Sequence, residues 1–278
     1  MVTMNKKYYQ QYFKDKKFVC LVVRDSAYLK IKYPNTDWSY HDHRDSDIDL
    51  YLEAAEYLTT QGYYVFRMGE NVDKALKSDN PMIIDYANNG MRSDFLDIFL
   101  GANCSFCIST GLGFDGIPSI FRRPILFIGS TPVGGLHLSS KDYLVSFKHH
   151  YSHSLKRNLT LKEIFDNELD FAYTKNEFIN KNVEINGLSS QEIRDITEEM
   201  VLRTNNKYNE TEEEKQQQIE FFTDYKKCME NRITKRVKKE RVSDLKDVGQ
   251  EWHGIINAKI SSIFLKKYYR DSIRLKNK

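Results

Sequence analysis

Short, uninterrupted runs of apolar residues, each followed by a polar turn, limit most strongly what this chain can fold into. Residues 18–23 read FVCLVV, residues 63–67 read YYVFR and residues 125–128 read ILFI. Hydrophobicity that is continuous rather than alternating is typical of strands buried on both faces, as in a parallel sheet covered by helices. The pattern predicts an α/β fold with a Rossmann-like parallel sheet flanked by helices.

The segments between these runs complete the pattern. Further strands are expected at residues 82–86, 105–109 and 142–147, the last of them at the edge of the sheet. Helices are expected at residues 48–60 (capped by Ser46 or Asp47), 95–102 (capped by Ser93 or Asp94) and 161–169 (capped by Thr160). Because the strands are parallel, the crossovers between them should be right-handed.

From about residue 176 the sequence becomes charged and helical in character. Helices are expected at residues 191–204 and from Thr211, which forms a capping box with Glu214, to about residue 231. Residues 255–269 predict an amphipathic helix whose apolar stripe consists of Ile256, Ile260, Ile263, Phe264 and Tyr268. We therefore predict two domains: a Rossmann-like domain at residues 1–175, and a helical C-terminal part at residues 176–278 that packs on it.

The net charge of +3 conceals an uneven distribution. Residues 201–278 hold 19 Lys/Arg against 12 Asp/Glu, a net charge of +7, which leaves −4 on the rest of the chain. Six of these basic residues lie between Arg232 and Arg241. Such a run is either a solvated helix or a contact for an anionic surface such as a membrane. No aromatic residues are interleaved with these cations, and no nucleic-acid motif is present, so we expect no nucleic-acid partner.

Cysteine usage and targeting segments both bear on the compartment of the protein. Four cysteines do not make a disulfide framework in a chain of this length. Cys104 and Cys107 form a CxxC motif, but inside an expected buried strand their side chains point to opposite faces, so we expect core residues. The N-terminus lacks an apolar signal core, and no run approaches the ~20 apolar residues of a membrane span. A cytoplasmic protein is predicted.

The most informative single motif is a glycine-rich turn after the strand at residues 105–109. Its spacing Gly111-x-Gly113-x-x-Gly116 matches a dinucleotide fingerprint. However, the turn follows a late strand, Pro118 shortens the next helix, and no acidic residue closes a second strand about 20 residues later. We expect no cofactor.

The chemistry of this turn nevertheless suits an anion. Ser109, Thr110, Gly111 and Gly113 offer hydroxyl and backbone N–H donors where a helix begins, an arrangement that favours phosphate. The alternative is a tight strand-to-helix crossing that needs glycine only for its conformation.

Arginines follow the earlier strands. Arg24 and Asp25 end the first strand, and Arg67 ends the second. Arginine at such a position suits bidentate binding of phosphate, and the neighbouring aspartate is either its salt-bridge partner or a general base. Arg44 repeats the same Arg-Asp-Ser triplet before the next helix. Because the carboxyl ends of parallel strands lie at one edge of a sheet, we expect these arginines to converge with the Ser109 turn.

A metal site is not expected. The histidines at positions 41, 43, 149, 150 and 153 lie in predicted loops and have no HExxH or carboxylate spacing. The sequence Asp45-Ser46-Asp47 is the nearest approach to a DxD-type pair, and it has the character of a helix cap.

Three stretches together resemble a known family. They read FVCLVVRDSAYL, HRDSDIDLYLEAAEYLTTQGYYVFRMG and SDFLDIFLGANCSFCISTGLGFDGIPSIFRRPILFIG, and LSSQEIRDITEEM is similar too. In order and spacing they resemble bacterial glycosyltransferases of surface-polysaccharide loci, over roughly residues 18–169. The resemblance implies the nucleotide-sugar-binding half of a GT-B-like enzyme, in which two Rossmann-like domains face each other across a cleft.

The resemblance implies a metal-independent glycosyltransferase that moves a sugar from a nucleotide-activated donor to a cell-surface glycan or lipid-linked glycan acceptor. Arg24 and Asp25 are the expected catalytic residues, and Asp115 is a second candidate base. Arg24, Arg44, Arg67 and the turn residues are expected to bind the donor phosphate. Such a protein would work in the cytoplasm at the inner face of the membrane, which the basic C-terminal region would contact.

Such enzymes carry an N-terminal acceptor domain, whereas only 17 residues precede Phe18 here. Either the helical C-terminal part and a partner chain build the acceptor side, or the chain is a truncated or split enzyme. The alternative functions are a non-catalytic nucleotide- or glycan-binding partner subunit and, with less support, a nicotinamide-dependent oxidoreductase.

Overall fold

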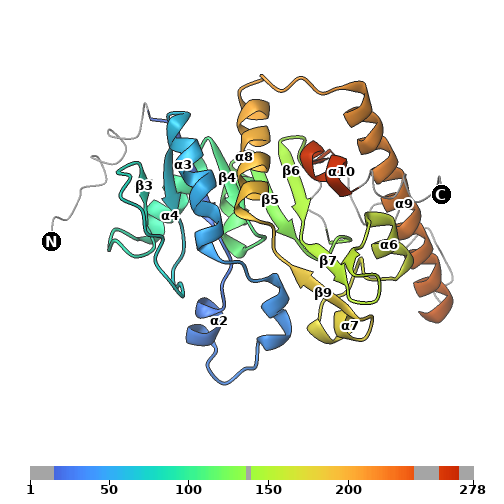
Figure 1. Cartoon of the computed structure of the whole chain (residues 1–278). Helices are drawn as coiled ribbons and strands as arrows, with labels where there is room; N and C mark the ends of the chain where they lie inside the picture. Colours follow the sequence, from blue (N-terminus) through green and yellow to red (C-terminus); the bar gives the residue numbers. More distant parts are fainter. Residues whose placement is uncertain (1–15, 136–138, 241–256, 269–278) are drawn as a thin grey trace. The chain divides into compact units, whose positions relative to one another are not determined.

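The computed structural model describes residues 16–135, 139–240 and 257–268 (Figure 1). The chain forms two compact units that interleave in sequence. Unit 1 contains residues 1–36, 45–126 and 189–194, and unit 2 contains residues 37–44, 127–188 and 195–278. Each unit is described by itself below. The predicted division of the chain near residue 175 stays a prediction.

Six of the seven strands of the main sheet lie where the apolar runs predict strands, and residues 259–260 are the exception. The seven-stranded sheet has the order β10-β6-β5-β4-β1-β2-β3. Its strands are β1 (Phe18–Val22), β2 (Tyr64–Arg67), β3 (Ile83–Ile84), β4 (Phe106–Ser109), β5 (Ile125–Ser130), β6 (Tyr143–Phe147) and β10 (Lys259–Ile260). The order 3-2-1-4-5-6 is that of Rossmann folds. The predicted Rossmann-like α/β fold, a parallel sheet flanked by helices, is thereby confirmed.

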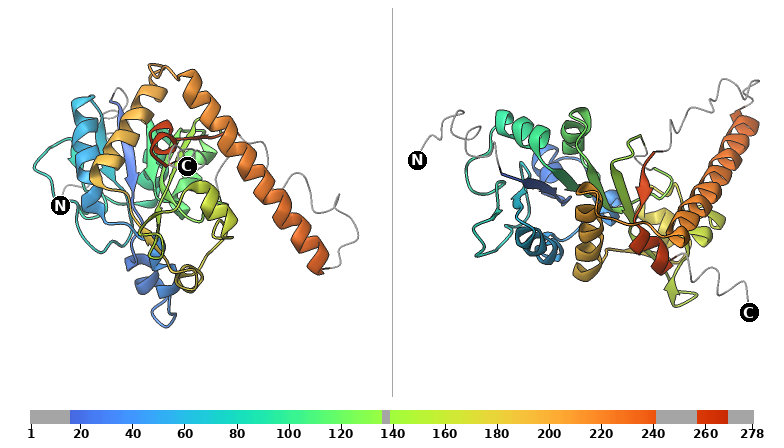
Figure 2. Two further views of the ribbon diagram at one scale, coloured as in Figure 1. Left: turned by 45° about the vertical axis from the view of Figure 1, so that its right-hand side comes forward. Right: turned by 90° about the horizontal axis from the view of Figure 1, so that it is seen from above.

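In unit 1, β1 is the central strand, and all five of its residues are buried. It pairs in parallel with β2, where Val19 lies opposite Val65, and with β4, where Val22 lies opposite Ser109. A strand with partners on both sides and helices over both faces can only be apolar, which explains its composition. Figure 2 (right) shows α3 on one face of this part of the sheet and α4 on the other.

Two caps predicted in unit 1, at Asp47 and Ser93, are confirmed, whereas the helix at residues 27–32 is not predicted and its N-cap Ser26 makes no side-chain capping bond. The helices of unit 1 are α2 (Ala27–Lys32), η2 (Ile48–Tyr51), α3 (Leu52–Thr60), α4 (Asp94–Asn103), η3 (Gly113–Asp115) and α5 (Gly116–Ile120). Asp47 caps η2 by accepting from Asp49 N, and Ser93 caps α4 by accepting from Leu96 N. The predicted helix at residues 48–60 is therefore one 3-10 turn followed by an α-helix.

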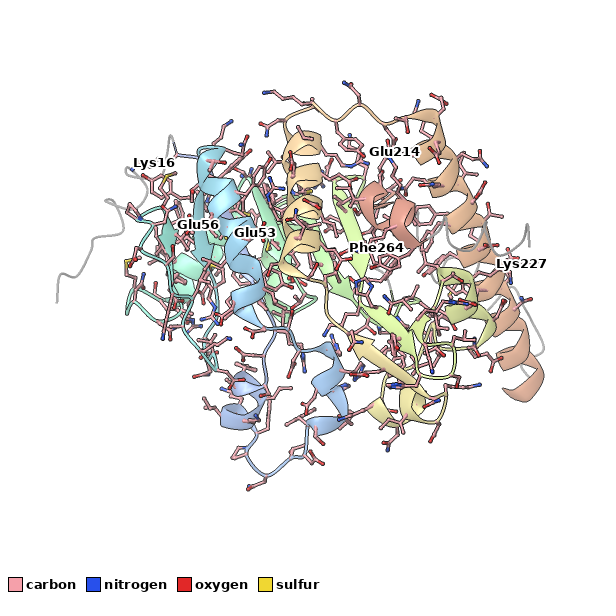
Figure 3. The ribbon with its side chains drawn as sticks, viewed as in Figure 1. Lys16, Glu53, Glu56, Glu214, Lys227 and Phe264 are labelled. Carbon is pink, nitrogen blue, oxygen red and sulfur yellow. The ribbon has the colours of Figure 1, made fainter. Side chains whose placement is uncertain are left out.

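The loop between β2 and β3 is attached to α3. Glu56, labelled on α3 in Figure 3, accepts hydrogen bonds from Ser78 Oγ at 2.8 Å and Asn80 Nδ2 at 2.7 Å. These bonds hold the polar loop of residues 68–82 against the helix, although the loop contributes little apolar surface of its own.

Unit 2 contains a second sheet that the sequence did not predict. It is antiparallel, in the order β8-β7-β9, and consists of β7 (His149–Ser152), β8 (Arg157–Asn158) and β9 (Val183–Asn186). The helices assigned wholly or partly to unit 2 are η1 (Ser39–Arg44), α6 (Leu161–Asp166), α7 (Lys175–Ile179), α8 (Ser190–Thr204), α9 (Glu212–Glu240) and α10 (Ser262–Tyr268). The capping boxes at Thr160 and Thr211 are confirmed.

The predicted helix at residues 255–269 is wrong in its central part. Residues 259–260 form β10, which pairs in parallel with β6, so β6 is not an edge strand. The buried Glu199 accepts from Ser261 Oγ at 2.7 Å and Ser262 N at 3.1 Å, and the Gln218 side chain bonds both backbone groups of Ile260. These contacts end the strand and start α10, and they override the helical periodicity. Residues 255, 256 and 269 lie outside the described part.

Two further expectations concern the core and the membrane. Cys20, Cys104 and Cys107 are buried and free, as predicted for core residues. Burial in the apolar interior raises the pKa of the Cys107 thiol well above its usual value, so the thiol stays protonated. Among the described residues, no helix combines the length and apolar character needed to cross a bilayer.

Candidate functional site

The carboxyl ends of β1 and β4 mark the switch point of the sheet in unit 1. From β1 the chain moves to β2 and β3 on one side and then returns to β4 on the other. In open α/β sheets, ligands bind outside the carboxyl ends of the strands at such a point. Arg24 follows β1 after Val23, and the glycine-rich turn starts at Ser109, the last residue of β4. The sheet therefore places two of the predicted site segments side by side.

Arg24 is held at this point by contacts on both of its ends. Its backbone N–H donates to Thr110 Oγ1 at 2.8 Å, which bridges the ends of β1 and β4. Its Nε donates to Asp45 Oδ1 at 2.9 Å, and the Arg24 side chain is 12% exposed. The two Nη groups have no partner among the described residues. A guanidinium fixed through Nε with free Nη groups is suited to bind an anion in a defined orientation.

The glycine-rich turn beside Arg24 is open to a ligand. Gly111 has φ +83°, a conformation that glycine adopts without strain, and its N–H donates to Ser109 Oγ at 3.0 Å. A Cβ added at Gly111, Gly113 or Gly116 would meet nothing within 4 Å. These glycines therefore leave the backbone approachable, and Gly113 begins η3, whose first N–H groups have no intrahelical partner.

Part of the turn is already occupied by the chain's own carboxylate. Asp115 Oδ2 accepts from Leu112 N at 2.7 Å, while Oδ1 is buried and has no partner in the described part of the chain. The residue is 7% exposed. Burial raises the pKa of Asp115 to about 6, although the nearby Ser109 hydroxyl and the Leu112 N–H favour the charged form. The turn thus contains a carboxyl group that gains and loses its proton close to neutral pH.

Arg67 and Asp25 form a separate, buried arrangement. Arg67 is 1% exposed and lies between Asp85, at 3.4 Å, and Asp25, at 3.9 Å. Each oxygen of Asp25 also accepts a backbone N–H, from Ala27 at 3.0 Å and from Asp73 at 3.0 Å. Arg67 therefore ties the segment after β1 to the segment after β3, while Asp25 also joins the loops after β1 and β2. The Nε of Arg67 is a buried donor without a partner in the described part.

A crevice of about 350 Å³ lies next to this arrangement. It is lined by Val23, Asp25, Asp45, Ser46, Asp47, Ile48, Asp73 and Lys74. Lys74 is paired with Asp47 at 2.5 Å and with Asp49 at 2.6 Å. The crevice is lined by four carboxylates and one ammonium group. It therefore favours hydrogen-bond donors such as hydroxyl groups over phosphate.

In unit 1 the backbone N–H of Arg24 joins the turn that contains Ser109, Thr110, Gly111 and Gly113, because it donates to Thr110 Oγ1, whereas Asp25 contacts Arg67. The binding and catalytic roles of these residues stay predictions. Arg67 belongs to the same group of strand ends but is enclosed by carboxylates. Arg44 lies in η1, which is part of unit 2. No three His, Cys, Asp or Glu side chains of the described residues are grouped as metal ligands would be.

The sequence reasoning missed the partners of the two arginines. Asp45 was interpreted as part of a helix cap, yet it pairs with Arg24. Asp85 had been assigned only to a strand, and it pairs with Arg67. More acidic residues follow the strands than helix capping requires, and this excess is the sequence signal that could have indicated ion pairs with the arginines.

Comparisons with models of known protein families, with curated proteins and with solved structures found no match.

Proposed function

We propose that the protein is a glycosyltransferase that transfers a sugar from a nucleotide-activated donor to a cell-surface glycan or lipid-linked glycan acceptor, without a metal ion. The observation that carries this proposal is Arg24, oriented by Asp45 and Thr110 at the switch point, with its two Nη groups free. Breaking the glycosidic bond of a sugar nucleotide leaves negative charge on a phosphate, which needs fixed positive charge and N–H donors. Arg24 and the turn at residues 109–113 supply both.

The neighbouring crevice supports the same proposal. The hydroxyl groups of a donor sugar would find acceptors in the carboxylates that line it, while the phosphate would lie toward Arg24 and the open glycines. One strand edge thus offers separate places for the polar and the anionic half of a sugar nucleotide. Arg67 would act indirectly, by holding Asp25.

An acceptor hydroxyl that attacks the sugar must lose its proton to a base. Asp25 uses both oxygens on backbone N–H groups, whereas Asp115 has one oxygen without a partner among the described residues and a pKa raised to about 6 by burial. A base works best when its pKa lies near the working pH. We therefore place Asp115 ahead of Asp25 for this role, and we assign Asp25 to positioning the loop.

The basic C-terminal region would hold the protein at the inner face of the membrane, close to a lipid-linked acceptor.

The second candidate function is a nucleotide- or glycan-binding subunit without catalysis. The partial occupation of the turn by Asp115 favours it, because a phosphate must compete with this carboxylate for the donors of the turn. A binding subunit would be stabilised by the ligand and would show no turnover.

The proposal is tested by thermal-shift screening against UDP-, GDP-, CMP- and dTDP-sugars, followed by a donor-turnover assay on each stabilising compound. Stabilisation with turnover supports the glycosyltransferase, and stabilisation without turnover supports the binding subunit. In the Arg24→Ala variant, turnover should fall by about 10²–10³-fold, the usual effect of removing one charge-stabilising donor. Unchanged turnover in a folded Arg24→Ala variant would remove Arg24 from the site.

A further inference from the structure

A second pocket lies within unit 2, and the proposed chemistry does not use it. It has a volume of about 420 Å³, and η1, α7 and β9 all contribute to its wall. Figure 1 shows α7 next to β9. The exposed rim carries Asp42, Lys175, Asn182 and Glu184, and the more buried His43 and Phe178 also line it. A polar rim with a ring-lined interior is the usual construction of a binding pocket.

The histidines beside this pocket are hydrogen-bond acceptors without a partner. His43 Nδ1 lies 3.2 Å from Tyr40 O, and His150 Nδ1 lies 3.1 Å from Lys148 O. A backbone carbonyl can only accept, so in each neutral ring the proton is on Nδ1 and Nε2 carries the free lone pair. Both Nε2 atoms are buried and have no partner among the described residues. Buried polar atoms are rarely left in this state unless a ligand or water satisfies them.

Both rings stay neutral at physiological pH. Burial lowers the pKa of His43 and of His150 to about 4, and the ammonium of Lys148 opposes protonation of His43 as well. Lys148 itself donates from Nζ to the His43 carbonyl at 2.9 Å. The Phe178 ring lies 5.3 Å from the His43 ring and 5.7 Å from the His150 ring, so the three rings pack together. His43 therefore contributes a neutral ring, and no positive charge, to the wall of the pocket.

The rim has the charge balance expected for a neutral ligand. Asp42 and Glu184 carry negative charge, Lys175 carries positive charge, and Glu184 also lies 3.3 Å from His153. This balance gives phosphate no net attraction. Hydroxyl groups, in contrast, donate to carboxylates and to an imidazole lone pair and accept from ammonium and amide groups. Ile179, which is 57% exposed, adds an apolar surface against which the C–H face of a sugar ring can pack.

We propose that this pocket binds a saccharide. The proposal stands on the pocket alone and does not depend on the proposed glycosyltransferase function. The rim carboxylates of Asp42 and Glu184 would accept from hydroxyl groups of the sugar, and Lys175 and Asn182 would donate to them.

The test is saturation-transfer difference NMR on the full chain with glucose, galactose, N-acetylglucosamine and lactose, each at millimolar concentration. At least one probe should give signals with the wild-type protein. In Glu184→Gln, which removes a rim carboxylate without touching the buried rings, the affinity should fall by about tenfold or more. Asp42→Asn removes the second rim carboxylate and serves if Glu184→Gln fails to fold. Asp142→Asn, an exposed change in unit 2 outside the pocket, is the matched control and should bind as the wild type does.

The Arg24→Ala variant separates this proposal from the proposed function. It should keep the saccharide signals and lose the binding of the sugar nucleotide. No signal from any of the four saccharides, or equal signals from the wild type, Glu184→Gln and Asp42→Asn, would overturn the saccharide pocket. Either result would leave the nucleotide-sugar proposal untouched.

Discussion

Replacing Asp115 with asparagine should make the protein more stable at neutral pH and less active. The native state holds the carboxyl proton more tightly than the unfolded chain does, because burial raises the pKa from 3.8 to about 6. Ionisation of the Asp115 carboxyl therefore lowers the free energy of unfolding as the pH rises between these two values, and the full loss is present above pH 6. About two pKa units correspond to ~3 kcal/mol at pH 7.5, falling to ~1 kcal/mol at pH 4.5.

Asparagine removes this cost but brings one of its own. Its oxygen can still accept from Leu112 N, while its amide nitrogen takes the position of the unpartnered Oδ1. A buried donor without a partner costs about 1–2 kcal/mol. The expected net gain is therefore about 1–2 kcal/mol at pH 7.5, and at pH 4.5 the variant should be no more stable than the wild type.

The assay is urea unfolding followed by circular dichroism at both pH values. Asp79→Asn, which removes an exposed carboxylate of unit 1, is the control and should leave the midpoint unchanged at each pH. Donor turnover by Asp115→Asn should fall, because the amide cannot take a proton. A loss of stability at pH 7.5, or an equal effect at the two pH values, would refute the reasoning on the Asp115 carboxyl.

Three further substitutions test separate parts of the structure. Asp45→Ala should lower turnover by about 10–100-fold, because it releases the Arg24 side chain. Asp45→Asn keeps an acceptor for Arg24 Nε and should retain part of the turnover that Asp45→Ala loses. Equal turnover in the two variants would mean that Asp45 does not position Arg24. Gly111→Ala should cost about 1–2 kcal/mol of unfolding free energy, the strain of φ +83°, since a Cβ there meets no other atom within 4 Å. A larger loss in chemical unfolding would contradict the open turn. Glu199→Gln should lower the free energy of unfolding by about 3–5 kcal/mol, because the buried Glu199 carboxylate pairs with Arg203 and accepts from residues 261–263. A loss below about 1 kcal/mol would argue against Glu199 as the residue that anchors α10.

Most of the main sheet could be predicted because its signal is local. The apolar runs at residues 18–22 and 125–128 are buried along their whole length. Strands that are buried on both faces have continuously apolar sequences, so the sequence predicts them directly. The caps at Ser93 and Thr160 also act over three residues, which is the range that a sequence pattern shows. Strand ends and helix starts, and hence the location of the glycine-rich turn, follow from these signals.

The parts that could not be predicted depend on contacts between distant residues. Adjacent aspartate and arginine residues suggested a pair, yet Arg24 binds Asp45, 21 residues away, because neighbouring side chains point in different directions. Residues 259–260 have helical periodicity, but Gln218 captures their backbone in a strand. β7 (HHYS) contains no aliphatic residue, and the apolar–polar alternation of β9 (VEIN) spans only four residues, so neither stands out as a strand in the sequence.

Hydrogen–deuterium exchange measured by mass spectrometry, with and without the sugar nucleotide that stabilises the protein, tests the central claim most directly. If the donor phosphate binds at Arg24 and the glycine-rich turn, peptides that cover residues 22–28 and 108–116 should exchange more slowly with the ligand present. The Arg24→Ala variant should lose this protection. Unchanged exchange in both peptides, or protection confined to other segments, would contradict the account.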